Sequence, residues 1–406
     1  MRPKHTPHSL SAFPVYSSAF VSTDELVLGG GGGQTRSGIK NKLVGARNYD
    51  CVAPDREISL LDEYELQMGE DAPMSMAANP KTHEIICGVN SALDALETVK
   101  NQNCRKFRVA DGKLSFEASQ STLTYDPDND DDDFQKITVF SPGGELVAVA
   151  GSRDLSVLRF PSLEPAATAL RLSKGEIYDA TFSSSNLVVA TTVNLMIYAV
   201  PSASEADDGT SEKQAGKQKE ISLELDLVQT IERPTLPGTD AGSSFRAVRY
   251  HPSNPTVLYT VLNTVPQRTR SKHSPRRAFV CKWNTDNWEV TKLRKVSDRN
   301  VTCFDVSPDG RFLAFGSSDY TVGVLDAQTL APLLTILKAH EFPPTTLKFN
   351  PTSSLLISGS ADSTVRVIAI PDQLVGASWS SWIIVIVTLL VILFAIIAQQ
   401  MHQAYQ

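Results

Sequence analysis

Short runs in which apolar and polar residues alternate recur along the chain, and turn residues separate them, a pattern that predicts β-strands. The clearest case is a block that occurs three times: Pro142 is followed by LVAVAGSRD, Pro308 by FLAFGSSD and Pro351 by LLISGSAD. In each block a Pro/Gly turn precedes an alternating apolar strand, the tetrapeptide Gly-Ser-x-Asp and a further strand such as TVRVIAI. The pattern therefore predicts one repeated unit of antiparallel strands.

The spacing of this unit indicates the class of fold. Asp319 and Asp362 end two successive blocks and lie 43 positions apart, within the roughly 40 to 45 residues of a WD repeat. We predict an all-β fold, a seven-bladed WD-type β-propeller over residues 1–375. Weaker copies of the strand pattern occupy Phe13–Tyr49, Met74–Asn90, Ile177–Val200 and Phe245–Asn284.

Three polar insertions lengthen the repeats without breaking the pattern. Ser119–Asp133 is acidic, Ser202–Glu220 is rich in Ser, Glu and Lys, and Val265–Arg277 is rich in Arg. Insertions of this kind map to loops on the faces of a propeller.

The C-terminal end of the chain has a different pattern, because Trp382–Ala398 (WIIVIVTLLVILFAIIA) carries no charge. As a helix it would be about 26 Å long, close to the thin core of the endoplasmic reticulum (ER) membrane. Its Ile, Val, Leu and Phe residues favour insertion by roughly 4 to 8 kcal/mol. We predict a juxtamembrane segment and transmembrane helix over 376–398, and a short lumenal tail over 399–406. A buried core helix is the weighed alternative.

The N-terminal residues Met1–Leu10 lack the apolar stretch of a signal peptide. Together with the short C-terminal tail, this predicts a single-pass protein whose large N-terminal domain is cytosolic.

Composition agrees with a globular cytosolic domain and argues against nucleic-acid binding. Hydrophobic residues make up 41% of the chain, and the net charge is -7, whereas a phosphate backbone requires a concentrated basic face. The odd number of cysteines includes no Cys-x-x-Cys pair, which predicts reduced thiols in or near the core rather than disulfides or a zinc site. They are Cys51, Cys87, Cys104, Cys281 and Cys303.

The segment LVLGGGGGQTRSGIKNKL, residues 26–43, contains five consecutive glycines, Gly29 to Gly33. Ordering a glycine costs up to about 1 kcal/mol relative to alanine, so such a run predicts a backbone that bends sharply or approaches something closely. A flexible hairpin tip is the alternative. Gly33–Gly38 has the spacing of a P-loop, but Ile39 stands where the lysine belongs and β-like residues follow instead of a helix. Nucleotide binding by this loop is therefore disfavoured.

A glycine run followed by Gly-Ile-x-Asn, on a WD-type propeller with one C-terminal membrane helix, resembles the Sec-twelve family of ER guanine nucleotide exchange factors, relatives of the prolactin regulatory element-binding protein. The similarity covers the whole layout, with Gly29–Leu43 as its specific signature and Asp71–Met76 as a second matching stretch. Blade patterns alone would identify only a widespread fold.

The resemblance implies that the chain activates the Sar-type small GTPase of the COPII coat at the ER membrane and so starts ER-to-Golgi vesicle formation. It implies that Asn41 and Ile39 contact the GTPase and promote GDP release without covalent chemistry. It also implies a potassium ion held by the backbone carbonyls of the five glycines: Gly29, Gly30, Gly31, Gly32 and Gly33.

Other candidate sites have simpler structural explanations. Asp126–Asp132 spells the start of a calcium loop, but position six is Asp131 and position twelve is Ile137, so a solvated acidic loop is favoured. The Arg268–Arg277 cluster predicts an exposed insertion, with contact to anionic lipid or a regulatory role as alternatives.

His340 lies 22 residues before Asp362, where WD repeats use a His–Asp contact to brace a blade, and bracing is favoured over catalysis. The spelling Asn300-Val301-Thr302 is a glycosylation sequon, which a cytosolic placement leaves unmodified.

Two further function classes remain beside the exchange factor. A membrane-anchored propeller scaffold without exchange activity is the main alternative. A hydrolase is disfavoured because no Ser, Cys or His constellation suggests a nucleophile.

Overall fold

The computed structural model describes residues 4–34, 37–47, 58–79, 81–82, 84–92, 100–124, 133–200, 224–237, 242–265, 276–371, 386–395, 397 and 399–400. The chain divides into two compact units, Met1–Ala369 and Ile370–Gln406. The predicted boundary at residue 375 lies a few residues beyond this division.

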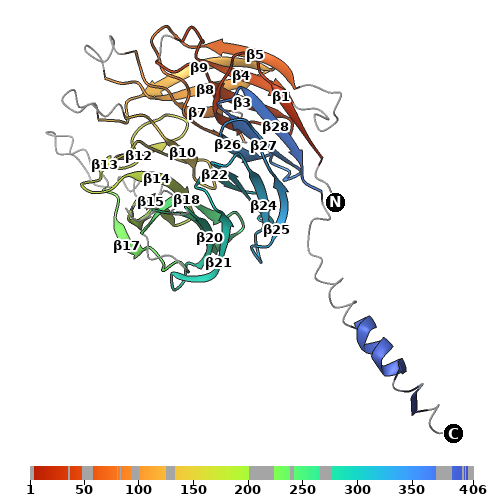
Figure 1. Cartoon of the computed structure of the whole chain (residues 1–406). Coiled ribbons are helices and arrows are strands. Elements are labelled where there is room, and N and C mark those ends of the chain that lie inside the picture. Colours follow the sequence, from red (N-terminus) through yellow and green to blue (C-terminus); the bar gives the residue numbers. More distant parts are fainter. Residues whose placement is uncertain are drawn as a thin grey trace, which may run out of the picture. The chain divides into compact units, whose positions relative to one another are not determined.

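The first unit consists of seven four-stranded antiparallel sheets, which confirms the predicted seven-bladed propeller. Figure 1 shows the sheets following one another in chain order. From the innermost to the outermost strand, the first three blades are β2 (Val15–Phe20), β3 (Glu25–Gly30), β4 (Lys42–Arg47) and β5 (Ser59–Glu65); β6 (Ser75–Asn79), β7 (Glu84–Gly88), β8 (Cys104–Ala110) and β9 (Lys113–Gln120); and β10 (Ile137–Phe140), β11 (Leu146–Ala150), β12 (Asp154–Arg159) and β13 (Leu170–Arg171).

The fourth to sixth blades are β14 (Ile177–Phe182), β15 (Asn186–Thr191), β16 (Asn194–Ala199) and β17 (Leu227–Glu232); β18 (Ser243–His251), β19 (Asn254–Thr264), β20 (Ala278–Asn284) and β21 (Glu289–Ser297); and β22 (Val301–Val306), β23 (Phe312–Ser317), β24 (Val322–Asp326) and β25 (Pro332–Ile336).

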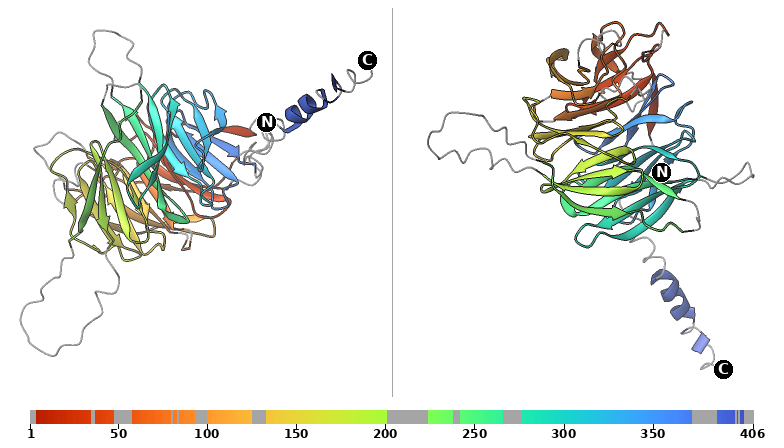
Figure 2. Two further views of the ribbon diagram at one scale, coloured as in Figure 1. Left: turned by 90° about the horizontal axis from the view of Figure 1, so that it is seen from below. Right: turned by 90° about the vertical axis from the view of Figure 1, so that its left-hand side faces the viewer.

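The last blade closes the ring with a strand from the other end of the unit. It contains β26 (Pro344–Phe349), β27 (Leu355–Ser360), β28 (Thr364–Ala369) and, outermost, β1 (His5–Ser9). His5 pairs with Ile368 and Ser9 with Thr364, and Figure 2 shows the red β1 strand alongside the blue strands of this sheet. The pairing fixes the first and last blades to each other through main-chain hydrogen bonds.

The core lies between neighbouring sheets. Leu187 and Val189 of one blade pack with Leu155 and Val157 of the blade before it, and Phe245 and Leu262 pack with Ile197. The second and third strands are buried on both faces, so they read as near-continuous apolar runs.

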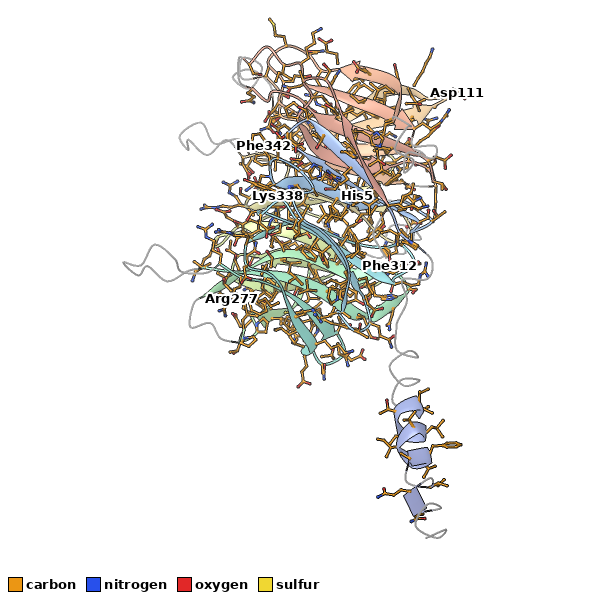
Figure 3. The ribbon with its side chains drawn as sticks, turned by 45° about the vertical axis from the view of Figure 1, so that its right-hand side comes forward. His5, Asp111, Arg277, Phe312, Lys338 and Phe342 are labelled. Atoms are coloured by element: carbon orange, nitrogen blue, oxygen red, sulfur yellow. The ribbon has the colours of Figure 1, made fainter. Side chains whose placement is uncertain are left out.

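Antiparallel order gives the propeller two distinct faces. In every blade the second-to-third connection lies at the same end of the sheet as the link from the fourth strand to the next blade. We call this end the glycine-loop face, because the β3–β4 connection, residues 31–41, lies there; the other end is the opposite face. Figure 3 shows Arg277, Lys338 and Phe342, which occupy such connections, on one side, and His5, Phe312 and Asp111 on the other. β28 ends at Ala369 on the opposite face, so the chain leaves the propeller there.

Residues 386–395 of the second unit are helical. Within the described residues, no helix is both long enough and apolar enough to cross a membrane. Part of the predicted 382–398 span lies outside those residues, and the membrane helix stays a prediction.

Candidate functional site: the glycine hairpin and its face

The glycine run ends one strand and begins a hairpin turn. Gly29 and Gly30 lie in β3, paired with Leu43 and Lys42 of β4. Gly31 leaves the strand with φ of 137°, in a region that favours glycine, and its N–H donates to the Pro14 carbonyl at 3.0 Å. A strand, not a helix, follows the turn, so the segment lacks the helix N-terminus that a phosphate-binding loop needs.

Neighbouring atoms occupy the space where side chains would stand on this run. A Cβ on Gly29 would lie 2.4 Å from the Ser17 hydroxyl, and one on Gly30 would lie 2.0 Å from the Pro14 carbonyl oxygen. On Gly31 it would meet the Asn41 amide oxygen at 2.3 Å, and on Gly32 the Ser37 hydroxyl at 2.0 Å. The run is therefore required by close packing, which supports the predicted backbone approach over a flexible tip.

Asn41 ties the two ends of the turn together. Its Oδ1 accepts the Gly33 N–H at 2.9 Å, while its Nδ2 donates to the Gly33 carbonyl at 2.8 Å and to the Glu70 carbonyl at 2.7 Å. The Asn41 carbonyl also accepts the Leu66 N–H at 2.9 Å. Asn41 thus joins the hairpin to the 66–74 connection, a structural role that sequence reasoning missed.

The other predicted contact residue, Ile39, is partly exposed. Its backbone N–H donates to the Ser37 hydroxyl at 3.3 Å. Lys40 beside it is exposed and pairs with Glu65 at 2.8 Å. Contact of Ile39 and Asn41 with a GTPase is untested by the chain alone and stays a prediction.

The oxygen atoms around the turn form the donor set that a hard cation such as potassium prefers. A Cβ on Gly31 would lie 2.6 Å from the Lys40 carbonyl oxygen, and one on Gly33 would lie 3.4 Å from an Asp71 carboxylate oxygen. These oxygen atoms are of the ligand type that a hard cation takes, and the potassium ion at the carbonyls of Gly29–Gly33 stays a prediction. Burial, and then the negative charge of Asp71, raises the pKa of Tyr16, which keeps that phenol neutral beside the turn.

A second polar cluster lies in the last blade and braces it, as predicted for His340. Its Nδ1 lies 2.7 Å from the Thr364 hydroxyl and 3.6 Å from an Asp362 carboxylate oxygen, and its Nε2 lies 2.8 Å from the Ser358 hydroxyl. The Asp362 carboxylate also accepts the Glu341 N–H at 2.6 Å. Burial lowers the pKa of His340 to about 4, so the ring is neutral near pH 7.

Four cysteines are free thiols in the described part, as predicted, and Cys51 lies outside it. Burial raises the pKa of Cys87 and of Cys281 to about 12. These two thiols are therefore not nucleophiles near pH 7.

Several predicted features lie outside the described residues, wholly or in part. They are Asp126–Asp132, the 202–220 insertion, and Arg268, Arg270 and Lys272 of the Arg-rich insertion.

Sequence comparison connects this hairpin-bearing propeller to known proteins. The chain is 22% identical to the guanine nucleotide-exchange factor SEC12 of Candida glabrata, over 98% of this chain and 80% of that protein. It is 26% identical to the SEC12-like protein 2 of Arabidopsis thaliana, over 83% of this chain and 74% of that protein. The chain resembles the SEC12-type guanine nucleotide-exchange factors.

The remaining comparisons concern the fold. The "WD domain, G-beta repeat" family model matches residues 290–326, which cover β21 to β24, and residues 331–368, which cover β25 to β28. The crystal structure of Chaetomium thermophilum Raptor superposes with a TM-score of 0.60 at 11% identity, covering 92% of this chain and 29% of that one. At this identity the Raptor structure shows the fold alone, and a fold does not identify a function.

Proposed function

We propose that this protein is a membrane-anchored guanine nucleotide exchange factor that activates the Sar-type small GTPase at the ER and so initiates COPII vesicle formation. The resemblance to SEC12-type exchange factors supports the reaction class. The choice of GTPase, membrane and coat comes from the signature at residues 29–43.

The observation that carries the proposal is an uneven distribution of exposed apolar side chains on the propeller. Among the described residues, the large exposed ones on strands are Leu60, Phe116, Leu227 and Val228, all on outermost strands. Those in connections are Met68, Val265, Leu337 and Phe342, and every one lies on the glycine-loop face. The glycine-loop face is therefore the face whose described connections offer large exposed apolar side chains to a partner.

The 337–343 connection is linked to the glycine hairpin by a short chain of contacts. The Phe342 carbonyl accepts the Ser360 hydroxyl at 3.2 Å, and the Ser363 carbonyl accepts the Leu10 N–H at 2.8 Å. The 10–14 link then reaches Gly31 through Pro14. Phe342 at 55% exposure therefore offers apolar area beside the blade that carries Ile39.

An exchange factor must bind the open, nucleotide-depleted GTPase more tightly than the closed form. A thousandfold faster GDP release corresponds to about 4 kcal/mol of such preference. A fixed hairpin can supply this preference, because its ordering cost is met during folding rather than on binding. Ile39 and Asn41 of the hairpin would contact the open GTPase, while exposed apolar side chains of the glycine-loop face bind it.

The same proposal places a potassium ion at the glycine turn and the apolar C-terminal segment in the ER membrane. Backbone carbonyl groups of Gly29–Gly33 would hold the ion and stiffen the hairpin.

The test follows release of fluorescent GDP from a Sar-type GTPase after addition of the full chain in mild detergent. We expect acceleration, and we expect Phe342→Ser to reduce it at least about tenfold, since burying a large apolar side chain contributes roughly 1.5 to 3 kcal/mol. The matched control is Leu60→Ser, which removes a residue with 52% exposure from an outer strand and should leave the rate unchanged.

No acceleration by the unmodified chain would contradict the exchange function and favour a scaffold. Equal acceleration of a Ras-type GTPase would contradict the Sar-type choice only.

A further inference from the structure

A cavity of about 350 Å³ opens on the glycine-loop face, away from the hairpin. Its wall combines inner-strand residues of three successive blades with the 265 and 276 ends of the β19–β20 connection. Residues that matter for its chemistry are Tyr178, Arg246, Asn263, Arg276 and Asn300. This volume falls in the range of small-molecule sites.

The wall of the cavity is cationic. Arg246 and Arg276 are among the described residues that line it, and none of those described lining residues is Asp or Glu. The nearest acidic side chain along β14 is that of Asp179. It forms an ion pair with the Arg249 guanidinium and accepts the Val248 N–H. The local charge therefore favours an anion.

Polar atoms of the wall have capacity for further hydrogen bonds. A guanidinium has five N–H donors, and Arg246 spends one on the Thr302 carbonyl at 2.5 Å while it lies 5.7 Å from the centre of the Tyr178 ring. The buried Oδ1 of Asn300 has no hydrogen-bond partner within the described part of the chain. The Asn263 amide is already hydrogen-bonded, because its Nδ2 donates to the Val301 carbonyl and its Oδ1 accepts the Val301 N–H.

We propose that this cavity binds a small molecule that carries a phosphate monoester. A phosphate monoester has a charge of about -1.5 to -2 near pH 7, which two guanidinium groups balance. Arginine offers the forked donor geometry that phosphate oxygens accept. The Asn300 amide would bind a hydroxyl group of the ester's organic part. This proposal does not depend on the exchange function, because it rests on the cavity alone.

Isothermal titration of the full chain at 0.15 M salt tests it, with ribose 5-phosphate as the probe, inorganic phosphate as the minimal anion and ribose as the neutral control. We expect saturable binding of one ribose 5-phosphate per chain, weaker binding of phosphate and none of ribose. Arg276→Gln should weaken binding at least about tenfold, the value of a charge-assisted pair. Arg276 is exposed, so this variant should fold normally.

The matched control is Arg153→Gln, which removes an exposed arginine from a second-to-third connection of the same face without touching the cavity. Equal weakening by both variants would show attraction by general charge and would overturn the proposal. Arg246→Gln should also abolish binding, and circular dichroism separates that loss from unfolding.

Absence of ribose 5-phosphate binding would overturn the proposal as well. Binding only to vesicles that contain phosphatidylinositol phosphate would do the same and would assign the cavity to a lipid headgroup.

Discussion

The second-to-third connections of the first and last blades hold equivalent places in the propeller but are stabilised differently. In the last blade the turn at residues 361–363 is held by side chains, with Asp362 accepting the Glu341 and Thr364 N–H groups and His340 packed behind it. In the first blade the described part of the 31–41 connection is held by close main-chain approach at its glycines and by the Asn41 amide, which bonds Gly33 and Glu70.

The difference separates scaffold from site. A turn whose polar side chains form a buried network stabilises its blade, but those side chains are not available to contact a partner. The glycine hairpin is held by its glycines and by Asn41, whereas Ile39 is partly exposed and Lys40 is fully exposed. Among the described residues of the two connections, residues 361–363 are only partly exposed, whereas the hairpin includes the fully exposed Lys40.

The largest expected effect concerns the side-chain network. The pKa of His340 is lowered to about 4 by burial, against 6.5 for an ordinary histidine, so the unfolded chain takes up a proton between these values and the folded chain does not. The free energy of unfolding should therefore fall by up to about 3 kcal/mol as the pH drops from 6.5 to 4. In His340→Gln this part of the pH dependence should vanish in urea unfolding curves, whereas parallel curves for the two proteins would contradict it.

The next effect concerns main-chain approach in the first blade. Gly30→Ala places a methyl group 2.0 Å from the Pro14 carbonyl oxygen, and such overpacking should lower the free energy of unfolding by about 2 kcal/mol. Gly242→Ala is the control, because nothing lies within 4 Å of its Cβ position. Equal stability of the two variants would show that the hairpin yields easily.

A smaller effect is expected where a side chain joins the hairpin to its neighbour. Asn41→Ala removes the bonds to Gly33 and to Glu70 and should cost about 1 to 2 kcal/mol. Faster amide hydrogen exchange at Gly33 measures the loosening directly. Asn41→Asp keeps the acceptor for the Gly33 N–H but loses both donors, so its Gly33 amide should stay better protected than in Asn41→Ala.

The smallest effect concerns the exposed side of the hairpin. Lys40 and Glu65 pair at 2.8 Å with side chains 70% and 53% exposed, so Lys40→Ala should change the free energy of unfolding by less than about 0.5 kcal/mol. If thermal unfolding shows a loss of more than about 1 kcal/mol in the free energy of unfolding, exposed residues stabilise the hairpin. The proposed difference from the buried network of the last blade would then be wrong.

The sequence predicts the blades best where burial imposes a pattern. β11, β23 and β27 lie where the repeated block predicts an apolar strand, because each is packed between two neighbouring sheets. Outermost strands escaped detection, since β5 and β17 are largely exposed and carry no alternation. β1 was missed for a related reason: His5–Ser9 is polar and joins the last blade through backbone pairing.

The glycine hairpin was predictable because five ordered glycines need a physical cause. The role of Asn41 was not, because its partner Glu70 comes from a connection 29 residues away. No sequence pattern indicates that pair. The cavity around Arg246 and Asn300 was equally hidden, since its wall comes from three blades that only the closed ring brings together.

The most direct test of the central claim is hydrogen exchange of the full chain, alone and in complex with a nucleotide-free Sar-type GTPase. We predict slower exchange in residues 37–41 and 337–343 on the glycine-loop face, with no change in the 307–311 and 285–288 connections of the opposite face. Protection confined to the opposite face, or a complex that leaves residues 37–41 unprotected, would contradict the assignment of the glycine hairpin as the exchange element.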